Sequence, residues 1–320
     1  KCFAGDAGYI GNVRALRDGV ASLKPDVVHV QSLISTRLDA LLWPIVRRRV
    51  PMVMTIHNVQ SHERIRWDDW TLWRCLATAD AVVVHTQEAL DVARRRLGPL
   101  ARIELIRMGD WGVFRGTEAG DRREARARLG FPDAAPIVLA FGAIRPYKGL
   151  DGVIAALPAV RRRHPGARLV IAGPLLAGSE SEYREAIRRA SVEDAVIFRP
   201  GYVPGDEVHR YFAAADIAVF NYTGITDSGS LRLACRMETP VVATAVGCFS
   251  EFLTDRVTAR LVPAGDPAAL AAALGDVLDD SAGAARMARA AAALARSAWS
   301  WADSARATLA LYGAVARGAR

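Results

Sequence analysis

The sequence contains very little lysine. Of its 42 Lys and Arg residues only Lys1, Lys24 and Lys148 are lysines. Its four cysteines are far apart and form no C-x-x-C pair, so neither a zinc site nor a redox dithiol is indicated. Dispersed cysteines are typical of a reducing compartment, and we expect a cytoplasmic protein. No apolar run approaches the ~20 residues that span a bilayer, which excludes an integral helical membrane protein.

Motifs of several common protein classes are also missing. The sequence has no G-x-S-x-G elbow, no Walker lysine motif and no G-x-G-x-x-G after an expected strand. Although the net charge is +8, no finger spacing, RNP-like strand or basic zipper accompanies it, so nucleic acid is not an expected partner. Most arginines are scattered beside alanines at helical spacing, which favours a solvated surface. Peripheral contact with an anionic membrane is the alternative use of this charge.

The composition is that of a folded protein with more than one domain. Hydrophobic residues make up 51% of the 320 residues, a length typical of two domains. Short runs rich in Val and Ile predict buried parallel strands. These runs are residues 26–31, 51–56, 81–85, 103–107, 137–141, 168–172, 195–198, 217–221, 240–244 and 260–263. Helical stretches lie between them, so we expect an α/β protein with parallel sheets covered by helices on both faces.

The alternation of strands and helices is interrupted once. Residues 111–121 are rich in glycine and lack periodicity, which indicates an interdomain linker. We expect a first Rossmann-like domain over residues 1–115 and a second over residues 116–297. The C-terminal helix, over residues 298–320, is expected to pack back on the first domain. Ligands should bind in the cleft between the domains, at the carboxyl ends of the strands.

The first segment with chemical potential is F-G-A-I-R-P-Y-K-G, which follows the expected strand at 137–141. Arg145 and Lys148 are fixed cations there, and Gly142 and Gly149 allow close backbone approach. Two cations near helix N–H groups suit a diphosphate and could neutralise its charge without a metal. The alternative is a capped turn with solvent-exposed cations. The rarity of lysine favours a function for Lys148.

The second segment follows the strand at 217–221 and opens a helix. Asp227, Ser228, Gly229 and Ser230 place small residues at the helix start, where free N–H groups form an anion site. A plain N-cap by Asp227 or Ser228 is the competing interpretation. Because the basic segment belongs to the same domain, we expect the two segments to form the two sides of one phosphate site.

The third segment, T-I-H-N-V-Q-S-H-E, lies at the carboxyl end of a strand in the first domain. His57 could contact a sugar hydroxyl or a reacting oxygen, and His62 and Glu63 provide a second polar pair. Their spacing is not that of a zinc protease, so a metal site is not expected. A purely structural histidine is the alternative for His57.

Together these segments resemble the retaining glycosyltransferases of the GT-B fold, family 4. The resemblance covers most of the chain. It is carried by FGAIRPYKGLDGVIAALPAV, LVIAGP, GYVPGDEVHRYFAAADIAVFNY and PVVATAVGCFSEFL, and in the first domain by PDVVHVQ and TIHN. It implies two Rossmann-like domains that face a cleft, with a nucleotide-diphosphate sugar held by the second domain and the acceptor by the first. It implies no metal and no cofactor other than this donor substrate.

The resemblance also implies roles by position in the second domain. Arg145 and Lys148 match the pair that binds the donor diphosphate, close to Gly142. Asp227 to Ser230 match the stretch that holds donor sugar hydroxyls and phosphate. The loop that reads the nucleotide base corresponds to Gly201, Tyr202 and Val203.

Roles in the first domain follow from the same resemblance. His57 matches a histidine that approaches the transferred sugar, and we count it with Arg145, Lys148 and Asp227 as catalytic. Asn58, His62 and Glu63 are expected on the acceptor side.

The sequence departs from the family pattern at several places. The family commonly has two glutamates eight residues apart, where this chain has Ile225 and Leu233. Asp227 could replace the first, whereas nothing replaces the second. Glu238 stands for a usual glycine, and a usual D-G-x-x-G turn reads D-R-V-T-A. The chain begins at Lys1, without Met or secretory signal, which suggests a fragment or a processed chain. Residues 1–24 predict a loop and a helix, so the N-terminal strand of this fold is expected to be missing.

These observations predict an enzyme that moves a hexose from a nucleotide sugar to a glycan, a lipid-linked oligosaccharide or a small acceptor, with retention. A GT-B epimerase or phosphorylase would use the same cleft without glycan transfer. A non-catalytic scaffold is the alternative outside enzymes, favoured by the missing glutamates.

Overall fold

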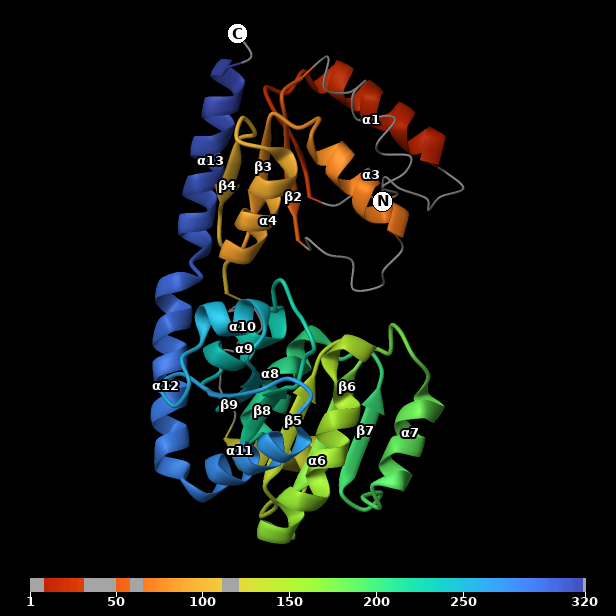
Figure 1. The fold of residues 1–320 in the computed structure, drawn as a ribbon, viewed down its shortest axis with the longest axis vertical. Helices are drawn as coiled ribbons and strands as arrows, with labels where there is room; N and C mark the ends of the chain where they lie inside the picture. Colours follow the sequence, from red (N-terminus) through yellow and green to blue (C-terminus); the bar gives the residue numbers. More distant parts are fainter. Residues whose placement is uncertain (1–8, 32–49, 58–65, 111–120, 319–320) are drawn as a thin grey trace. The chain divides into compact units, whose positions relative to one another are not determined.

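The computed structural model describes residues 9–31, 50–57, 66–110 and 121–318 of the chain. Its internal contacts divide the chain into two compact units (Figure 1). Unit 1 comprises Lys1–Met108 together with Trp301–Arg320, and unit 2 comprises Gly109–Ser300. The chain therefore crosses from one unit to the other twice.

Unit 1 is built on a parallel sheet whose described strands lie in the order β1-β2-β3-β4. Neighbouring strands are joined in register, as in the pairing of Val53 with Ala81 and of Thr55 with Val83. The elements of this unit are α1 (Tyr9–Leu23), β1 (Val28–Val30), β2 (Met52–Ile56), α3 (Arg66–Leu76), β3 (Ala81–Val84), α4 (Gln87–Leu97), β4 (Ile103–Leu105) and α13 (Trp301–Gly318).

Helices cover both faces of this sheet, because every residue of β2 and β3 is buried and apolar side chains point both ways. α3 and α4 pack on one face, where Met52, Met54 and Ile56 contribute to the core. α13 packs on the other face through Leu311 and Val315. The last helix of the chain thus completes the core of the unit that contains the first strands.

Unit 2 contains a parallel sheet of six described strands in the order β10-β9-β8-β5-β6-β7. β5 lies in the middle, with β6 and β7 on one side and β8 to β10 on the other. The elements are α5 (Arg122–Leu129), β5 (Ile137–Phe141), η3 (Pro146–Lys148), α6 (Leu150–Arg163), β6 (Arg168–Gly173), α7 (Glu180–Arg189), β7 (Val196–Pro200), α8 (Gly205–Ala214), β8 (Ile217–Phe220), α9 (Gly229–Arg236), β9 (Val241–Thr244), α10 (Gly247–Phe252), β10 (Arg260–Val262), α11 (Pro267–Asp279) and α12 (Ser281–Ala298).

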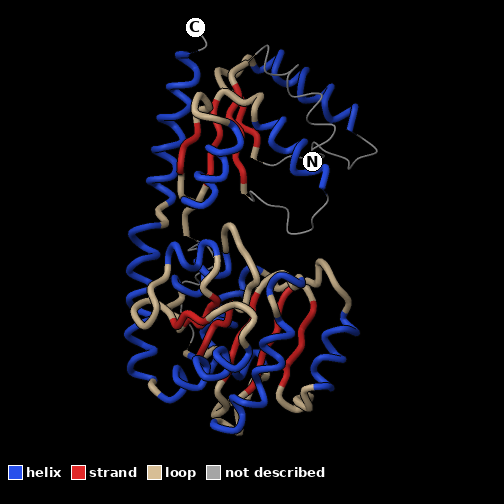
Figure 2. Tube along the Cα trace, in the orientation of Figure 1, coloured by secondary structure: helices blue, strands red, loops and turns tan. Residues whose placement is uncertain are grey.

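Two cores sandwich this sheet, and Figure 2 shows its strands between layers of helix. Ile137 and Leu139 of β5 point toward α5, α8, α9 and α10, together with the C-terminal half of α12. Val138 and Ala140 point toward α6, α7 and α11. The alternation of side chains along β5 therefore divides the unit into two apolar layers.

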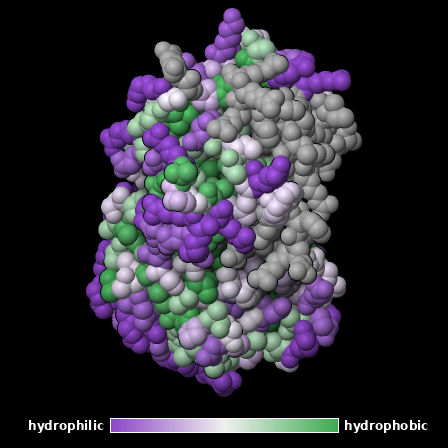
Figure 3. All heavy atoms as spheres, turned by 45° about the horizontal axis from the view of Figure 1, so that its top comes forward, coloured by the Kyte–Doolittle hydropathy of each residue, from purple (hydrophilic) through white to green (hydrophobic). Residues whose placement is uncertain are grey.

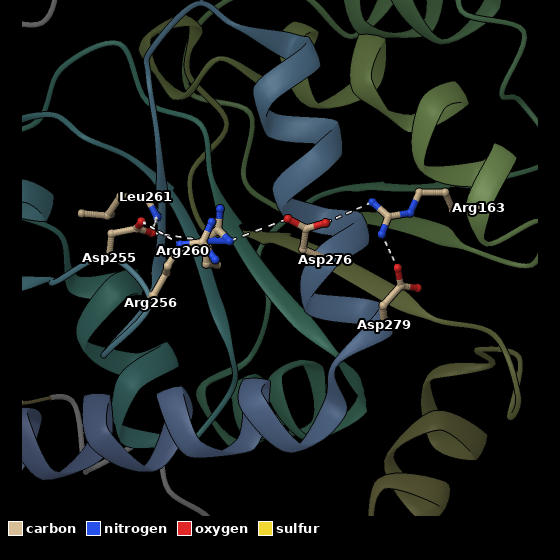
Figure 4. A network of polar contacts seen from close by, with 7 residues as sticks. All are labelled: Arg163, Asp255, Arg256, Arg260, Leu261, Asp276 and Asp279. Atoms are coloured by element: carbon tan, nitrogen blue, oxygen red, sulfur yellow. Dashed lines mark hydrogen bonds and ion pairs between the residues drawn. The ribbon is translucent and has the colours of Figure 1, made fainter.

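A polar network fastens the β10 edge of this sheet to the helices beside it (Figure 4). The guanidinium of Arg260 lies 3.2 Å from Asp255 Oδ1 and 3.8 Å from Asp276 Oδ2. Arg163, at the end of α6, pairs with Asp276 at 3.2 Å and with Asp279. Most of these groups are solvent-exposed, and exposed ion pairs contribute little to stability. We therefore expect the network mainly to orient α6, α11 and β10.

The expected fold class is confirmed. All ten expected strands form, in two parallel sheets, although β1 and β4 are shorter than predicted and β6 and β7 end one and two residues later. On the face drawn in Figure 3, hydrophilic residues are spread over the surface rather than gathered in one place. Among the helices that the structure describes, none is both long and apolar enough to cross a bilayer.

Candidate active site

The candidate donor site lies where the strand order of unit 2 reverses. β5 and β8 are neighbours in the sheet, whereas the strands that follow β5 and β8 in the chain lie on opposite sides of this pair. Ligands of open parallel sheets bind in the crevice at such a switch point, beyond the carboxyl ends of the strands. Segment 141–149 follows β5, and segment 221–230 follows β8. The topology therefore brings the two chemical segments together.

Gly142 marks the point at which the two segments meet. Its φ is +105°, and a Cβ atom built there would lie 2.7 Å from Ser230 Oγ and 3.1 Å from Lys148 Nζ. A side chain at this position would be strained and would collide with both groups. Lys148 and Ser230 therefore converge over a glycine whose missing side chain leaves room for both groups, while its N–H donates to the carbonyl of Ala172 at 2.9 Å.

Lys148 is a buried cation. It is the last residue of the short helix η3, it is 8% exposed, and its Nζ lies 5.3 Å from the centre of the Tyr222 ring. Burial, with a smaller contribution from the positive charge of Arg145, lowers the pKa of Lys148 to about 8. A buried ammonium next to a second cation is destabilised unless an anion joins it. The site is thus prepared electrostatically for a negatively charged ligand.

Tyr222 connects the two segments beneath this lysine. The ring is buried against Phe220, Phe249 and Tyr147, and its hydroxyl interacts with Ser228. Burial raises the pKa of the Tyr222 phenol well above its usual range, so the side chain stays neutral. A neutral aromatic ring thus separates Lys148 from the core and also contacts the start of α9.

The backbones of the segments are joined as well. Thr223 N donates to the carbonyl of Tyr147 at 2.8 Å, and Asn221 Nδ2 donates to the carbonyl of Gly149 at 2.8 Å. Gly149 has φ +60°, and a Cβ atom there would lie 2.1 Å from the carbonyl oxygen of Asn221. This glycine allows the turn after Lys148 to lie directly against the end of β8, which fixes the lysine relative to α9.

Ser228 is the N-cap of α9. Its Oγ accepts a hydrogen bond from Leu231 N at 3.2 Å, so the capping interpretation holds for this residue. Ser230, whose Oγ shares the space over Gly142 with Lys148 Nζ, belongs to the first turn of α9. An N-cap role and an anion site coexist here, because the cap satisfies only one of the free donors at a helix start.

Asp227 directly precedes the N-cap of α9 and is held by a residue of that helix. Its carboxylate lies 2.6 Å (Oδ1) and 2.9 Å (Oδ2) from the two terminal nitrogens of Arg232. Oδ1 also accepts a hydrogen bond from Ser228 N at 2.8 Å. Both carboxylate oxygens are therefore engaged inside the protein. Contact of Asp227 with a donor sugar stays a prediction.

The expected base loop lies on the β7 side of this cluster, and Gly173 lies between them, because a Cβ atom built on Gly173 would lie 2.3 Å from the carbonyl oxygen of Gly142. Gly201, Tyr202 and Val203 follow β7, two strands from β5, and Gly201 N donates to the carbonyl of Gly173 at 3.0 Å. Tyr202 is 81% exposed. Backbone groups and an exposed aromatic ring at the carboxyl end of a strand are suitable for contact with a nucleobase.

In unit 1, His57 follows β2, and its ring centre lies 5.0 Å from that of His85, which follows β3. Asn58, His62 and Glu63 lie outside the described residues. Sequence reasoning did not select His29, whose Nδ1 lies 2.6 Å from Tyr312 Oη and whose Nε2 lies 2.7 Å from Thr55 Oγ1. The feature of the sequence that could have identified His29 is a polar residue between valines in an expected strand.

Burial and two nearby histidines give His29 a definite charge state. Desolvation, then the charges of His57 and His85, lower the pKa of His29 below its ordinary value. A neutral imidazole has one donor and one acceptor nitrogen, which suits partners on both sides. The C-terminal helix thus contributes Tyr312 to the polar groups on the sheet of unit 1.

A surface depression lies away from the switch point. It has a volume of about 540 Å³ and lies beside β10, between the end of α11 and the first turns of α12. Its arginines are largely paired, Arg260 with Asp255 and Asp276 and Arg286 with Asp280. In the part of the chain that the structure describes, no three His, Cys, Asp or Glu side chains are placed to share a metal ion.

Two Rossmann-like units, with a cationic, glycine-containing turn at the switch point of the second, define a GT-B type α/β protein. The sequence profile described as "Glycosyl transferases group 1" matches residues 121–294, which is more than half of the chain. The profile described as "Glycosyltransferase Family 4" matches residues 4–109. The chain belongs to the group 1 glycosyl transferases.

Curated relatives agree with this assignment. A glycogen synthase of Mycobacterium tuberculosis is 32% identical over 311 residues, which cover 93% of this chain and 71% of the relative. A D-inositol 3-phosphate glycosyltransferase of Salinispora tropica is 34% identical over 253 residues, covering 74% of this chain and 52% of the relative. Both relatives are named as sugar-transferring enzymes, and they differ in the acceptor that their names imply.

Solved structures show the same fold. A sucrose-phosphate synthase from Thermosynechococcus elongatus superposes with a TM-score of 0.82 at 21% identity, covering 98% of this chain and 80% of that one. HepE from Anabaena, solved in complex with UDP-glucose, gives a TM-score of 0.82 at 20% identity, covering 96% and 84%. At these identities the likeness establishes the GT-B fold.

Proposed function

We propose that the protein transfers a hexosyl group from a nucleotide-diphosphate sugar to a hydroxyl of a glycan, a lipid-linked oligosaccharide or a small acceptor, with retention and without a metal. The observation that carries the proposal is the convergence of Lys148, Ser230 and Gly142 at the switch point of unit 2. The family membership and the complex of the structurally similar HepE with UDP-glucose support the same donor class.

The chemistry assigned to these groups is electrostatic. As the bond from the anomeric carbon to the diphosphate breaks, charge develops on the leaving phosphate oxygen. The ammonium of Lys148, the guanidinium of Arg145 and the N–H groups at the start of α9 stabilise it. The acceptor hydroxyl attacks from the face that the diphosphate leaves and loses its proton to the leaving group. His57 in unit 1 is assigned to contact with the transferred sugar.

The test begins with the donor. Full-length protein is incubated with radiolabelled UDP-, GDP- and dTDP-sugars and with a panel of glycan, lipid-linked and small acceptors. A labelled glycoside is the expected product. Free epimer or sugar phosphate would instead identify an epimerase or a phosphorylase. Absence of any nucleotide binding in calorimetry would identify a non-catalytic scaffold.

A single substitution tests the role of Lys148. We expect Lys148→Met to lower kcat/KM by on the order of 10²–10³-fold, the loss typical of removing one group that stabilises developing charge. Lys24→Met is the matched control, because Lys24 is exposed in unit 1. Near-normal turnover of Lys148→Met with an intact fold would contradict the assignment.

Membrane contact is proposed for the basic end of α4. Arg94, Arg95 and Arg96 are exposed there, and Leu100, just beyond, is fully accessible. Cations beside an exposed apolar side chain suit an anionic lipid surface. We expect vesicles with phosphatidylserine, but not with phosphatidylcholine alone, to bind the protein. The triple change of these arginines to glutamine should abolish binding, and unchanged sedimentation with vesicles would refute this surface.

A further inference from the structure

The core beneath the candidate donor site contains an ion pair. Arg232, in the first half of α9, is 1% exposed, and the Asp227 side chain that it contacts is 10% exposed. A buried guanidinium is costly unless its partner is well placed, and an apolar pair of similar volume would often serve stability as well. An ion pair at this buried position therefore meets some requirement other than packing of the core.

The first requirement is that the loop leading into α9 has a fixed position. The Asp227 carboxylate joins the backbone N–H of Ser228 to the terminal nitrogens of Arg232, so one side chain ties the start of α9 to a residue one turn further on. Ser228 in turn caps Leu231 N. The N–H groups that are assigned to the diphosphate thus belong to a loop whose position is fixed by Arg232.

The second requirement is electrostatic. A carboxylate at the start of α9 would repel a diphosphate bound by the same helix, since like charges at short range in a poorly hydrated site interact strongly. Arg232 compensates the charge of Asp227 within 2.6–2.9 Å. The pair is neutral as a whole, so the field at the helix start remains that of the helix dipole, Lys148 and Arg145.

The other side of the guanidinium is fixed by an aromatic ring. Arg232 Cζ lies 5.3 Å from the centre of the Trp299 ring, which is buried and contacts Phe252 edge-on. Trp299 ends α12, and its carbonyl accepts a hydrogen bond from Asp110 N at 2.8 Å. Arg232 is therefore clamped between the donor loop and the last residues of unit 2.

We propose that Arg232 is a positioning residue of the donor site. It holds and neutralises Asp227, and through it sets the start of α9 for the donor diphosphate. Asp227 acts through this pair and is not a catalytic residue in contact with the sugar. The inference rests on the proposed function, because it assigns the start of α9 to a nucleotide diphosphate.

A double-mutant cycle tests the proposal. Arg232→Met leaves the carboxylate buried and uncompensated, so we expect the Kd for UDP and the donor KM to rise 10- to 100-fold, with kcat changed less than tenfold. Asp227→Asn keeps the acceptor for Ser228 N without the charge. The double variant Arg232→Met/Asp227→Asn is therefore expected to recover UDP binding to within about fivefold of the wild type.

The opposite assignment gives a different pattern. If Asp227 contacted the sugar as a catalytic group, every variant with Asn at 227 would lose most of kcat, and the double variant would recover nothing. That result would overturn the proposal. A loss of UDP affinity in Arg232→Met that persists in the double variant would overturn it too, because charge compensation would then not be the cause.

A matched control separates positioning from general damage to α9. Arg236, one turn further along the helix, pairs with Asp110 at 3.2 Å and is also largely buried. We expect Arg236→Lys to lower the melting temperature while leaving the Kd for UDP within twofold. Arg232→Lys keeps the charge but cannot contact both oxygens of Asp227 through two nitrogens, so we expect it to raise this Kd by three- to fivefold. If Arg232→Met does not fold, this lysine pair decides the question. Equal UDP affinity in both would refute the proposal.

The wild-type protein provides the last distinction. If it binds none of UDP, GDP and dTDP, the proposed function itself fails. If it binds one of them and Arg232→Lys and Arg232→Met bind it equally well, the proposed function stands and the positioning role of Arg232 is wrong.

Discussion

At the scale of the residue, Lys148 suits an anionic ligand but lowers the stability of the ligand-free protein. Its pKa is about 8 in the folded protein against 10.5 for an ordinary lysine, mainly because the ammonium is buried. At pH 7 this charge costs the ligand-free protein about 3 kcal/mol. We expect Lys148→Met to raise the free energy of unfolding in urea by up to that amount while activity is lost. Lys24→Met should change neither, and a destabilised Lys148→Met protein would contradict this account.

The same shift predicts a pH dependence. Between pH 8 and 10.5 the unfolded chain binds more protons at Lys148 than the folded protein does, so the stability of the ligand-free protein should rise over this window from this group. UDP binding has the opposite sign, because the diphosphate favours the ammonium. We expect proton uptake on UDP binding at pH 9, measured by calorimetry in two buffers of different ionisation enthalpy. If Lys148→Met took up the same number of protons on UDP binding, the proton would bind to a group other than Lys148.

Which residues could be predicted from the sequence depended on how local their environment is. Lys148 and Ser230 lie in segments that follow expected strands, and parallel strands bring their carboxyl ends to one edge, so the placement of both residues at that edge was predictable. Arg232 was not, because its burial depends on Trp299, far away in the chain. His29 was missed for the same reason, since its partner Tyr312 comes from the last helix.

At the scale of the element, strands and helix ends were predictable because their signals are local. The strands at the centre of each sheet are buried on both faces, and apart from Thr55 they are therefore continuously apolar. Ser228 caps α9 where that helix was expected to begin, and Thr86 caps α4 in the same way. The order of the strands in unit 2 follows from packing between distant segments and could be expected only from the resemblance to a known family.

The cap of α9 gives a prediction at this scale. Ser228 and Ser179 are both N-caps, of α9 and α7, and each accepts a backbone hydrogen bond within its own helix. Replacing either by Ala should cost about 1 kcal/mol of stability. Only Ser228→Ala should also weaken UDP binding, by about tenfold, since the start of α9 is assigned to the diphosphate. Equal UDP affinity in the two variants would leave Ser228 with capping alone.

At the scale of the whole molecule, the last helix belongs to the same unit as the first strands. α13 supplies Leu311 and Val315 to the same core as Val53 and Val83, and Tyr312 contacts His29. The groups assigned to the donor diphosphate, from Gly142 to Arg232, all lie in unit 2. The last helix therefore supports the unit to which the acceptor is assigned.

Removal of residues 301–320 tests this division. It uncovers one face of the sheet in unit 1, so hydrogen exchange of β1 to β4 should become fast while β5 to β10 stay protected. UDP affinity should remain within about threefold, since no donor group is lost. Leu311→Ala should destabilise unit 1 by about 2–5 kcal/mol, whereas Leu309→Ala, at a position 67% exposed, should be nearly neutral. Loss of protection in β5 to β10 on truncation would mean that the two units fold as one. The described residues of the core that α13 completes all belong to unit 1, so the stability of unit 2 would then depend on a core outside it.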